Sequence, residues 1–192
     1  MVQDVMGYVS HKARGLVGEC DTPGNPNVSL MALALAAKSA GESVIRHCSR
    51  RPEVTPLITA LTQMGVAITQ SDAGVVVGGN TLQALNESVQ VGQSEWLLGC
   101  LAGLTAGADF QTKFEGQVEA HGVIAALEAL GAQIEKSTDG ACLIGVGGKP
   151  LMGAKHAIEE PDSVVKAAFF LAGLDASGDV HLAQNAAGDD DF

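Results

Sequence analysis

The segment LITALTQMGVAI at residues 57–68 recurs as VIAALEALGAQI at residues 123–134, and this repetition is the strongest indication of the fold. Around it, residues 39–77 align without a gap with residues 105–143, and ten of the 39 positions are identical. Self-similarity at a fixed spacing is typical of a chain that repeats one structural unit. We therefore predict a repeat architecture; the alternative is an ordinary α+β domain in which the two segments agree by coincidence.

Each repeat begins with a helix that is apolar on nearly every side. A helix without a polar face has to be buried in the core of the protein. A third copy occurs near Asp162, where KAAFFLAGLDASGDV echoes the earlier LMALALAAKSAGESV. We predict these helices at Val28–Ser39, Ser94–Thr105 and Ser163–Asp175. A strand is expected after each, at Ser43–Cys48, Asp109–Phe114 and Asp179–Gln184.

The second half of each repeat reads as an amphipathic helix followed by a hairpin. Apolar side chains recur at helical spacing in two sets, Leu57, Leu61 and Met64, and Val123, Leu127 and Leu130. Gly65 and Gly131 end these helices, and polar loops finishing in glycine at Gly74 and Gly140 indicate hairpins. In the third copy the given sequence stops after the first strand, so we expect that unit to be incomplete.

These patterns together predict an α/β (α+β) fold of repeated βαβαββ units. The units are expected to pack around a pseudo-threefold axis, with the first helix of each unit in the centre and the strands outside. The chain is interpreted as a single domain, 1–192, with units at about 15–80, 81–149 and 150–192.

The charge balance narrows the classes of partner. The formal net charge is -11, from 11 Lys and Arg against 22 Asp and Glu. Such an acidic chain repels phosphates, so we expect no nucleic-acid and no membrane partner. No apolar run reaches the roughly 18 residues of a membrane span, and residues 1–14 show no secretory signal.

The cysteines and histidines indicate no redox or metal chemistry. No CxxC pair occurs, and the four cysteines are expected to be buried free thiols, which favours the cytoplasm: Cys20, Cys48, Cys100 and Cys142. The five histidines share no metal-ligand spacing: His11, His47, His121, His156 and His181. We therefore predict no metal site and no cofactor.

Three segments carry a resemblance to a known family. They are GLVGECDTPGNPNVSLMALALAAKSAG from residue 15, VGQSEWLLGCLAGLTAG from residue 91 and EPDSVVKAAFFLAGLDASGDV from residue 160. Together they resemble one domain of the enolpyruvyl transferases of the enolpyruvylshikimate-phosphate synthase type. The resemblance implies a shikimate-pathway transferase that moves the enolpyruvyl group of phosphoenolpyruvate to shikimate 3-phosphate. It also implies a cleft between two similar domains.

The chemical residues of the family's motifs are mostly replaced in this chain. The family's PGDKSISHR corresponds to PGNPNVSLM at residues 23–31, so Pro26 and Met31 stand where the resemblance implies a lysine and an arginine that bind anions. The small residues of GNAGT become a segment with Glu95 and Trp96, and the third motif's glutamine becomes Val164. We therefore assign no catalytic residue.

Polar residues at the starts of the central helices are the candidate substrate-binding residues by motif position. They are Asn27, Ser29, Gln93, Ser94 and Ser163. Helix starts carry unpaired N–H groups, so helix capping is the plainest role, and a small anionic or polar ligand is the alternative. Arg50 and Arg51, the adjacent basic pair, are interpreted as solvated loop residues.

Three hypotheses for function follow. The first is a non-catalytic, single-domain relative, a pseudoenzyme acting as a structural or interaction subunit. The second is part of an active transferase completed by a second domain or chain. The third is a small-molecule binding module.

We also predict a protein partner or a homo-oligomer. The predicted contact faces are an apolar cluster at the helix starts, Leu30, Met31 and Trp96, and a flank around Phe169 and Phe170.

Overall fold

The structure is a computed structural model that describes residues 22–79, 82–136, 142–159 and 162–184. The second unit shows the repeat in full. Its elements are β4 (Val89–Gly92), α3 (Glu95–Thr105), β5 (Gln111–Gly116), α4 (His121–Ala129), β6 (Ile134–Lys136) and β7 (Cys142–Gly147). The strands form one sheet in the order β4-β5-β7-β6, with β4 parallel to β5 and the other neighbours antiparallel. The predicted βαβαββ order is therefore confirmed in this unit.

The described parts of the other two units repeat pieces of the same pattern. The first unit has α1 (Pro26–Lys38), β1 (Gly41–Ile45), α2 (Thr55–Gln63), β2 (Ala67–Ser71) and β3 (Gly74–Gly79). Its sheet order β1-β3-β2 matches β5-β7-β6 of the second unit. The third unit has β8 (Lys155–Ile158), α5 (Ser163–Gly173) and β9 (His181–Gln184), and β8 pairs parallel with β9 as β4 does with β5.

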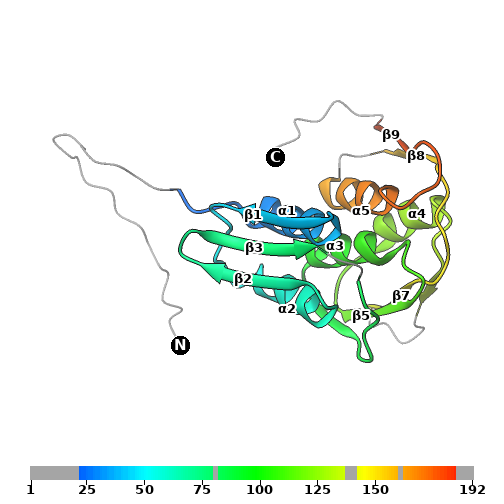
Figure 1. The fold of residues 1–192 in the computed structure, drawn as a ribbon. Coiled ribbons are helices and arrows are strands. Elements are labelled where there is room, and N and C mark those ends of the chain that lie inside the picture. The colour runs from blue at the N-terminus through cyan, green and yellow to red at the C-terminus, as the bar shows by residue number, and fades with distance from the viewer. Residues whose placement is uncertain (1–21, 80–81, 137–141, 160–161, 185–192) are drawn as a thin grey trace, which may run out of the picture.

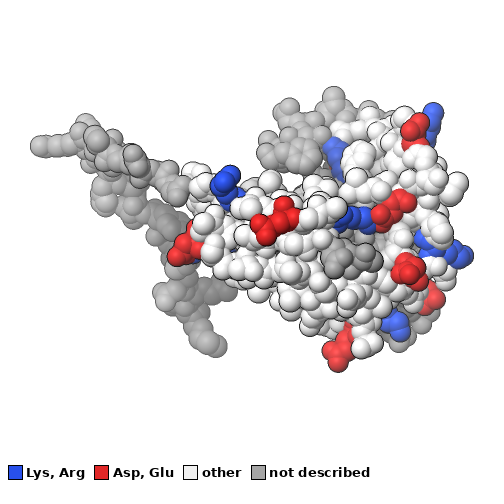
Figure 2. Space-filling view, in the orientation of Figure 1, with Lys and Arg blue, Asp and Glu red and all other residues white. Residues whose placement is uncertain are grey.

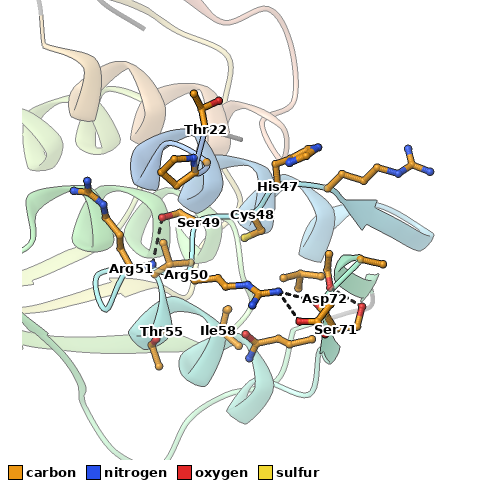
Figure 3. A pocket seen from close by; sticks show the side chains of 18 residues that line it. Thr22, His47, Cys48, Ser49, Arg50, Arg51, Thr55, Ile58, Ser71 and Asp72 are labelled. Atoms are coloured by element: carbon orange, nitrogen blue, oxygen red, sulfur yellow. Dashed lines mark hydrogen bonds and ion pairs between the residues drawn. The ribbon is translucent and has the colours of Figure 1, made fainter. Parts of the chain in front are cut away.

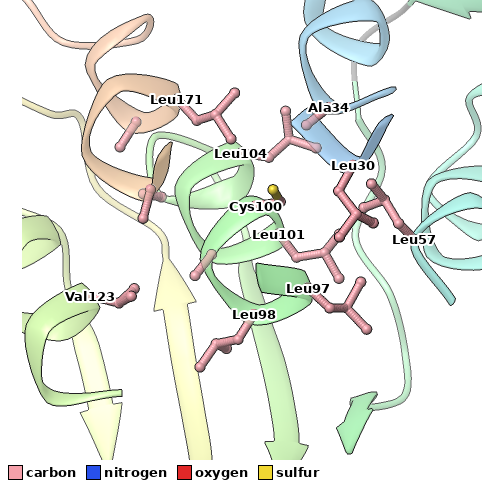
Figure 4. Packing of buried hydrophobic residues seen from close by; sticks show 14 of the residues in the cluster. Leu30, Ala34, Leu57, Leu97, Leu98, Cys100, Leu101, Leu104, Val123 and Leu171 are labelled. Carbon is pink, nitrogen blue, oxygen red and sulfur yellow. The ribbon is translucent and has the colours of Figure 1, made fainter. Parts of the chain in front are cut away.

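The three central helices lie side by side, as predicted. Each of α1, α3 and α5 contacts the other two, with the sheets outside them (Figure 1). Every residue of α3 from Leu97 to Thr105 is buried, which agrees with its lack of a polar face. Figure 4 shows the shared core, in which Leu97 and Leu101 of α3 lie on the side that faces Leu57 of α2.

Glycines allow α3 and α5 to approach closely. A Cβ added at Gly99 would meet Val164 Cγ1 at 2.6 Å, and one added at Gly103 would meet the carbonyl oxygen of Ala168 at 2.5 Å. Glycine inside a helix costs about 1 kcal/mol relative to alanine. The close contact between the two helix backbones offsets this cost with dispersion energy.

The outer helices are placed by the apolar stripes that the sequence predicted. Leu57, Leu61 and Met64 are buried, and so are their counterparts on α4, Val123, Leu127 and Leu130. Each outer helix is followed by a glycine with a positive φ, 88° at Gly65 and 86° at Gly131. This left-handed conformation suits glycine and turns the chain into the hairpin.

The strand boundaries differ from the sequence prediction by a few residues. The first strand ends at Ile45 instead of Cys48, because His47 adopts a left-handed conformation with a φ of 54° and ends the extended segment. The strand predicted from Asp109 begins at Gln111, and the last one begins at His181. Cys100 is buried and Cys48 half-buried, both as free thiols, while Cys20 lies outside the described residues.

No helix in the described part of the chain is long and apolar enough to cross a membrane. Figure 2 shows acidic and basic side chains interspersed over the face drawn, with no basic patch gathered on it. The assignment of 1–192 to a single domain, with unit boundaries near residues 80 and 149, stays a prediction.

Candidate functional site

The candidate site lies where the central helices begin. Asn25 precedes α1, and its side-chain oxygen accepts hydrogen bonds from the backbone N–H groups of Asn27 at 2.9 Å and Val28 at 3.2 Å. Pro26 occupies the first helical position, where its missing N–H costs nothing. The proline at the motif position of the family's lysine therefore starts the helix.

The other two central helices are also capped by their own chain. Ser94 Oγ accepts from Leu97 N at 3.2 Å and caps α3. Asp162 Oδ1 accepts from Val164 N at 2.8 Å and from Val165 N at 3.0 Å, and so caps α5. These backbone donors are the groups that a bound anion would use at a helix start. Asp162 also brings a negative charge to this position.

The five candidate residues have different surroundings. Ser94 has the predicted capping role, whereas α1 and α5 are capped by Asn25 and Asp162 and not by Asn27 or Ser163. The sequence signals for the two missed caps are an Asn before a Pro at a helix start and an Asp two residues before an apolar run. Gln93 is exposed in the turn before α3.

Ser29 has a structural role in the core. Its hydroxyl donates to the carbonyl of Asn25 at 2.8 Å and accepts from the backbone N–H of Ser49 at 2.9 Å. Gly24 packs against the same loop, and a Cβ there would overlap the carbonyl oxygen of His47. Two residues that agree with the family motif, Gly24 and Ser29, thus join the start of α1 to the β1–α2 loop.

An apolar groove runs between α1 and α5 and has a volume of about 570 Å³. We call it the α1–α5 groove, defined by Met31, Leu35, Trp96, Ala167, Phe170 and Leu182. Asn27 and Ser163 also line it, so the fold brings these two candidate residues to one surface, while Ser29, Gln93 and Ser94 do not line it. Met31, at the motif position of the family's arginine, faces an apolar surface here.

Two of the predicted contact residues lie elsewhere. Leu30 and Phe169 are buried in the core, at 1% and 0% exposure, because helical spacing turns them inward from their neighbours Met31 and Phe170. Phe170 is 48% exposed and Leu35 is 42% exposed. The remaining members of the two predicted faces, Met31, Trp96 and Phe170, line this one groove.

A second cavity, of about 900 Å³, gathers the arginines of the β1–α2 loop. We call it the arginine pocket; Arg46, His47, Arg50, Arg51 and Asp72 line it, with the start of α2 beside them. Arg50 Nη2 donates to Asp72 Oδ1 at 3.0 Å, an exposed ion pair. Figure 3 shows Arg50 extended toward Asp72 and Arg51 directed away from that pair. Sequence reasoning missed this grouping because the β2–β3 hairpin supplies its far wall.

The thiols and the possible metal ligands offer no reactive centre among the described residues. Burial raises the pKa of the Cys100 thiol to about 12. Burial also raises the pKa of Cys48, against a smaller opposing effect of its hydrogen bond with Ser29. Within residues 22–79, 82–136, 142–159 and 162–184, no group of three or more His, Cys, Asp or Glu side chains is placed to hold a metal ion.

Comparison with known proteins identifies the family. A family model described as EPSP synthase (3-phosphoshikimate 1-carboxyvinyltransferase) matches residues 11–189. A protein named 3-phosphoshikimate 1-carboxyvinyltransferase from Lactiplantibacillus plantarum is 31% identical over 172 residues, covering 85% of this chain and 40% of the relative. A protein of the same name from Limosilactobacillus fermentum is 32% identical over 180 residues, covering 90% of this chain and 42% of the relative.

A solved structure supports the fold. EPSP synthase from Acinetobacter baumannii superposes with a TM-score of 0.82 at 23% identity, covering 90% of this chain and 42% of that one. The chain thus spans about 40% of the length of the curated relatives it matches. By its match over residues 11–189, this chain belongs to the EPSP synthase (3-phosphoshikimate 1-carboxyvinyltransferase) family.

Proposed function

We propose that this chain is a non-catalytic member of the EPSP synthase family that acts as a structural or interaction subunit. The main support for the proposal is that side chains of the same chain already cap the starts of the three central helices. Asn25, Ser94 and Asp162 already accept hydrogen bonds from the first-turn N–H groups. An anionic substrate would have to displace these caps, at a cost of about 1 kcal/mol for each helix.

The charges near the helix starts add to this argument. Glu95 lies in the first turn of α3, and the cap of α5 is the carboxylate of Asp162. Both interact favourably with the positive ends of the helix dipoles and therefore stabilise the fold. They would repel the phosphates of both family substrates. Each charge-assisted contact that a replacement such as Met31 removes costs about 1.5–3 kcal/mol of binding.

The test is phosphate release from shikimate 3-phosphate and phosphoenolpyruvate. We expect no turnover by the purified chain, with the Lactiplantibacillus plantarum relative assayed in parallel as the positive control. Turnover within a hundredfold of that relative would contradict the proposal.

The second hypothesis is a transferase part completed by a second domain or chain. The observation that favours it is the 31–32% identity to relatives named 3-phosphoshikimate 1-carboxyvinyltransferase, of which this chain spans 40–42%. The assay is to add the separately expressed remainder of such a relative. Activity that appears only in the mixture would favour this hypothesis over the first.

The third hypothesis, a small-molecule binding module, is supported by the arginine pocket. A thermal-shift screen with shikimate 3-phosphate, phosphoenolpyruvate and nucleotide-sugar anions tests it. A concentration-dependent rise in Tm that Arg51→Ala removes would favour it.

A cytoplasmic location remains our prediction, since the thiols described in this chain are unpaired.

A further inference from the structure

The arginines of this chain are concentrated in one place. The sequence contains four arginines, and three of them line the arginine pocket: Arg46, Arg50 and Arg51. The chain as a whole has a net charge of -11, so this gathering of positive charge runs against its composition. Arginine presents a planar set of N–H donors that matches the oxygens of a phosphate or carboxylate group. The pocket therefore has the chemistry of an anion site.

A carboxylate of the chain itself already uses one of these arginines. Arg50 Nη2 donates to Asp72 Oδ1 at 3.0 Å and to the carbonyl of Ser71 at 3.5 Å (Figure 3). Asp72 is the only carboxylate among the described residues that line the pocket. Both side chains of this ion pair are exposed, so water screens their attraction and the pair is weak. An oxygen of a ligand can therefore replace the Asp72 carboxylate on Arg50.

The backbone around the pocket is held from two sides. Ser49 N donates to Ser29 Oγ of α1 at 2.9 Å, and Gly24 packs against the carbonyl of His47. On the other side, β1 pairs with β3 along its whole length and so holds the β2–β3 hairpin beside the loop. A fixed backbone lowers the entropic cost of binding, because only the arginine side chains have to be ordered by a ligand.

The start of α2 adds a smaller contribution of the same sign. Among the described residues no side chain caps this helix, and its first turn contains no acidic residue. Helix α2 begins at Thr55, which lines the pocket, so the positive end of the helix dipole lies at the same cavity. The starts of α1, α3 and α5 differ, because side chains of the chain cap them.

We propose that the arginine pocket binds the phosphate group of a small metabolite, and that Asp72 competes with this group for Arg50. A phosphate monoester carries a charge of about -1.5 to -2 near pH 7, so several arginines attract it more strongly than they attract one carboxylate. The cavity of about 900 Å³ has room for the rest of such a molecule. None of the five candidate substrate-binding residues lines this pocket. This inference rests on the third hypothesis, a small-molecule binding module, and names its ligand class.

NMR amide shifts of the isotope-labelled chain, titrated with inorganic phosphate at constant ionic strength, test the proposal. We expect saturable shifts in the β1–α2 loop and at the β2–β3 hairpin. Arg50→Gln should weaken binding about tenfold, because a charge-assisted contact is lost. Asp72→Asn should strengthen it about two- to fivefold, because the competing carboxylate is removed. Lys113→Gln is the matched control, since it removes one positive charge from an exposed position on β5 outside the pocket and should leave binding unchanged.

Three results would overturn the inference. One is the absence of saturable shifts at tens of millimolar phosphate. The second is an Asp72→Asn variant, shown to be folded by the same spectra, that binds phosphate no more tightly than the wild type. The third is equally tight binding of malonate, a dicarboxylate, because the site would then not prefer phosphate.

This inference and the hypothesis beneath it fail separately. A ligand that raises Tm in the thermal-shift screen, but whose binding ignores both Arg50→Gln and Asp72→Asn, keeps the binding-module hypothesis and rejects this site. The phosphate-release assay reports on catalysis alone.

Discussion

Replacing Gly103 with alanine should destabilise the fold, although glycine is a poor helix former. A Cβ at this position would lie 2.5 Å from the carbonyl oxygen and 2.9 Å from the Cα of Ala168, whereas ordinary van der Waals contact begins near 3.4 Å. The obstacle is helix backbone, so no side chain can rotate to relieve the clash. Helix α5 has to move away from α3, and the core contacts between them loosen.

The magnitude follows from three opposing contributions. Alanine gains about 1 kcal/mol of helix propensity over glycine, and a buried methyl gains about 0.8 kcal/mol in transfer from water. Overpacking costs about 1–3 kcal/mol and more where backbone has to shift. Because the obstacle is helix backbone, the overpacking cost is at the upper end, about 3 kcal/mol, and the net loss is about 1 kcal/mol, which lowers Tm by about 2–4 °C in a domain of this size.

Urea unfolding followed by circular dichroism is the assay, with Gly173→Ala as the control. Gly173 is also in α5, but a Cβ there meets only the side chain of Val180, at 3.2 Å or more. We expect the control to be as stable as the wild type or up to about 1 kcal/mol more stable, because it gains helix propensity and meets no backbone. A Gly103→Ala variant as stable as the wild type would refute the close approach of α3 and α5.

Three further predictions concern stability. Lys38 donates a hydrogen bond to the carbonyl of Leu104 at 3.1 Å and forms an ion pair with Asp175. Lys38→Met should therefore lower the free energy of unfolding by about 1–2 kcal/mol. An unchanged Tm in thermal unfolding would contradict this link between the central helices. Thr112 is buried, and its hydroxyl has no hydrogen-bond partner within the described residues. Thr112→Val should therefore raise the free energy of unfolding, measured by urea titration, by about 1 kcal/mol. A lower free energy of unfolding would show that the hydroxyl has a hydrogen-bond partner. The pKa of Cys100 rises from 9.0 to about 12 on folding, so the unfolded chain loses this proton at a lower pH than the folded chain does. The free energy of unfolding should therefore fall as the pH rises between these values, with the slope expected for one proton. Cys100→Ala should remove this slope, and an identical slope in that variant would contradict the assignment.

The repeat and the buried helices were predictable because they depend on short-range patterns. The spacing of Leu57, Leu61 and Met64 is a property of one helix, and the sequence displays it directly. The identities between the first two units indicated a shared fold without any knowledge of distant contacts. The strand ends were less predictable, because the φ of His47 is set by the loop that packs on Gly24.

The candidate site was only partly predictable. The resemblance to the family implies from sequence alone that Pro26 and Met31 stand where cations are expected, and this stays a prediction. The capping roles of Asn25 and Asp162 could not be predicted, because they depend on the residue at which each helix begins. Helix boundaries shift by one or two residues with tertiary packing. The roles of Asn27 and Ser163 in ligand binding stay predictions.

The family and the repeated unit could be identified from the sequence, because both depend on residue identity and local spacing. Which apolar side chains stay exposed could be seen only in the folded chain. Leu30 and Met31 are neighbours in the chain, yet one is buried under α2 and α3 and the other lines the α1–α5 groove. Exposure depends on which segment packs against each face of a helix, and those segments lie far apart in the sequence. For the same reason the arginine pocket, built from the β1–α2 loop and the β2–β3 hairpin, appeared only once the chain was folded.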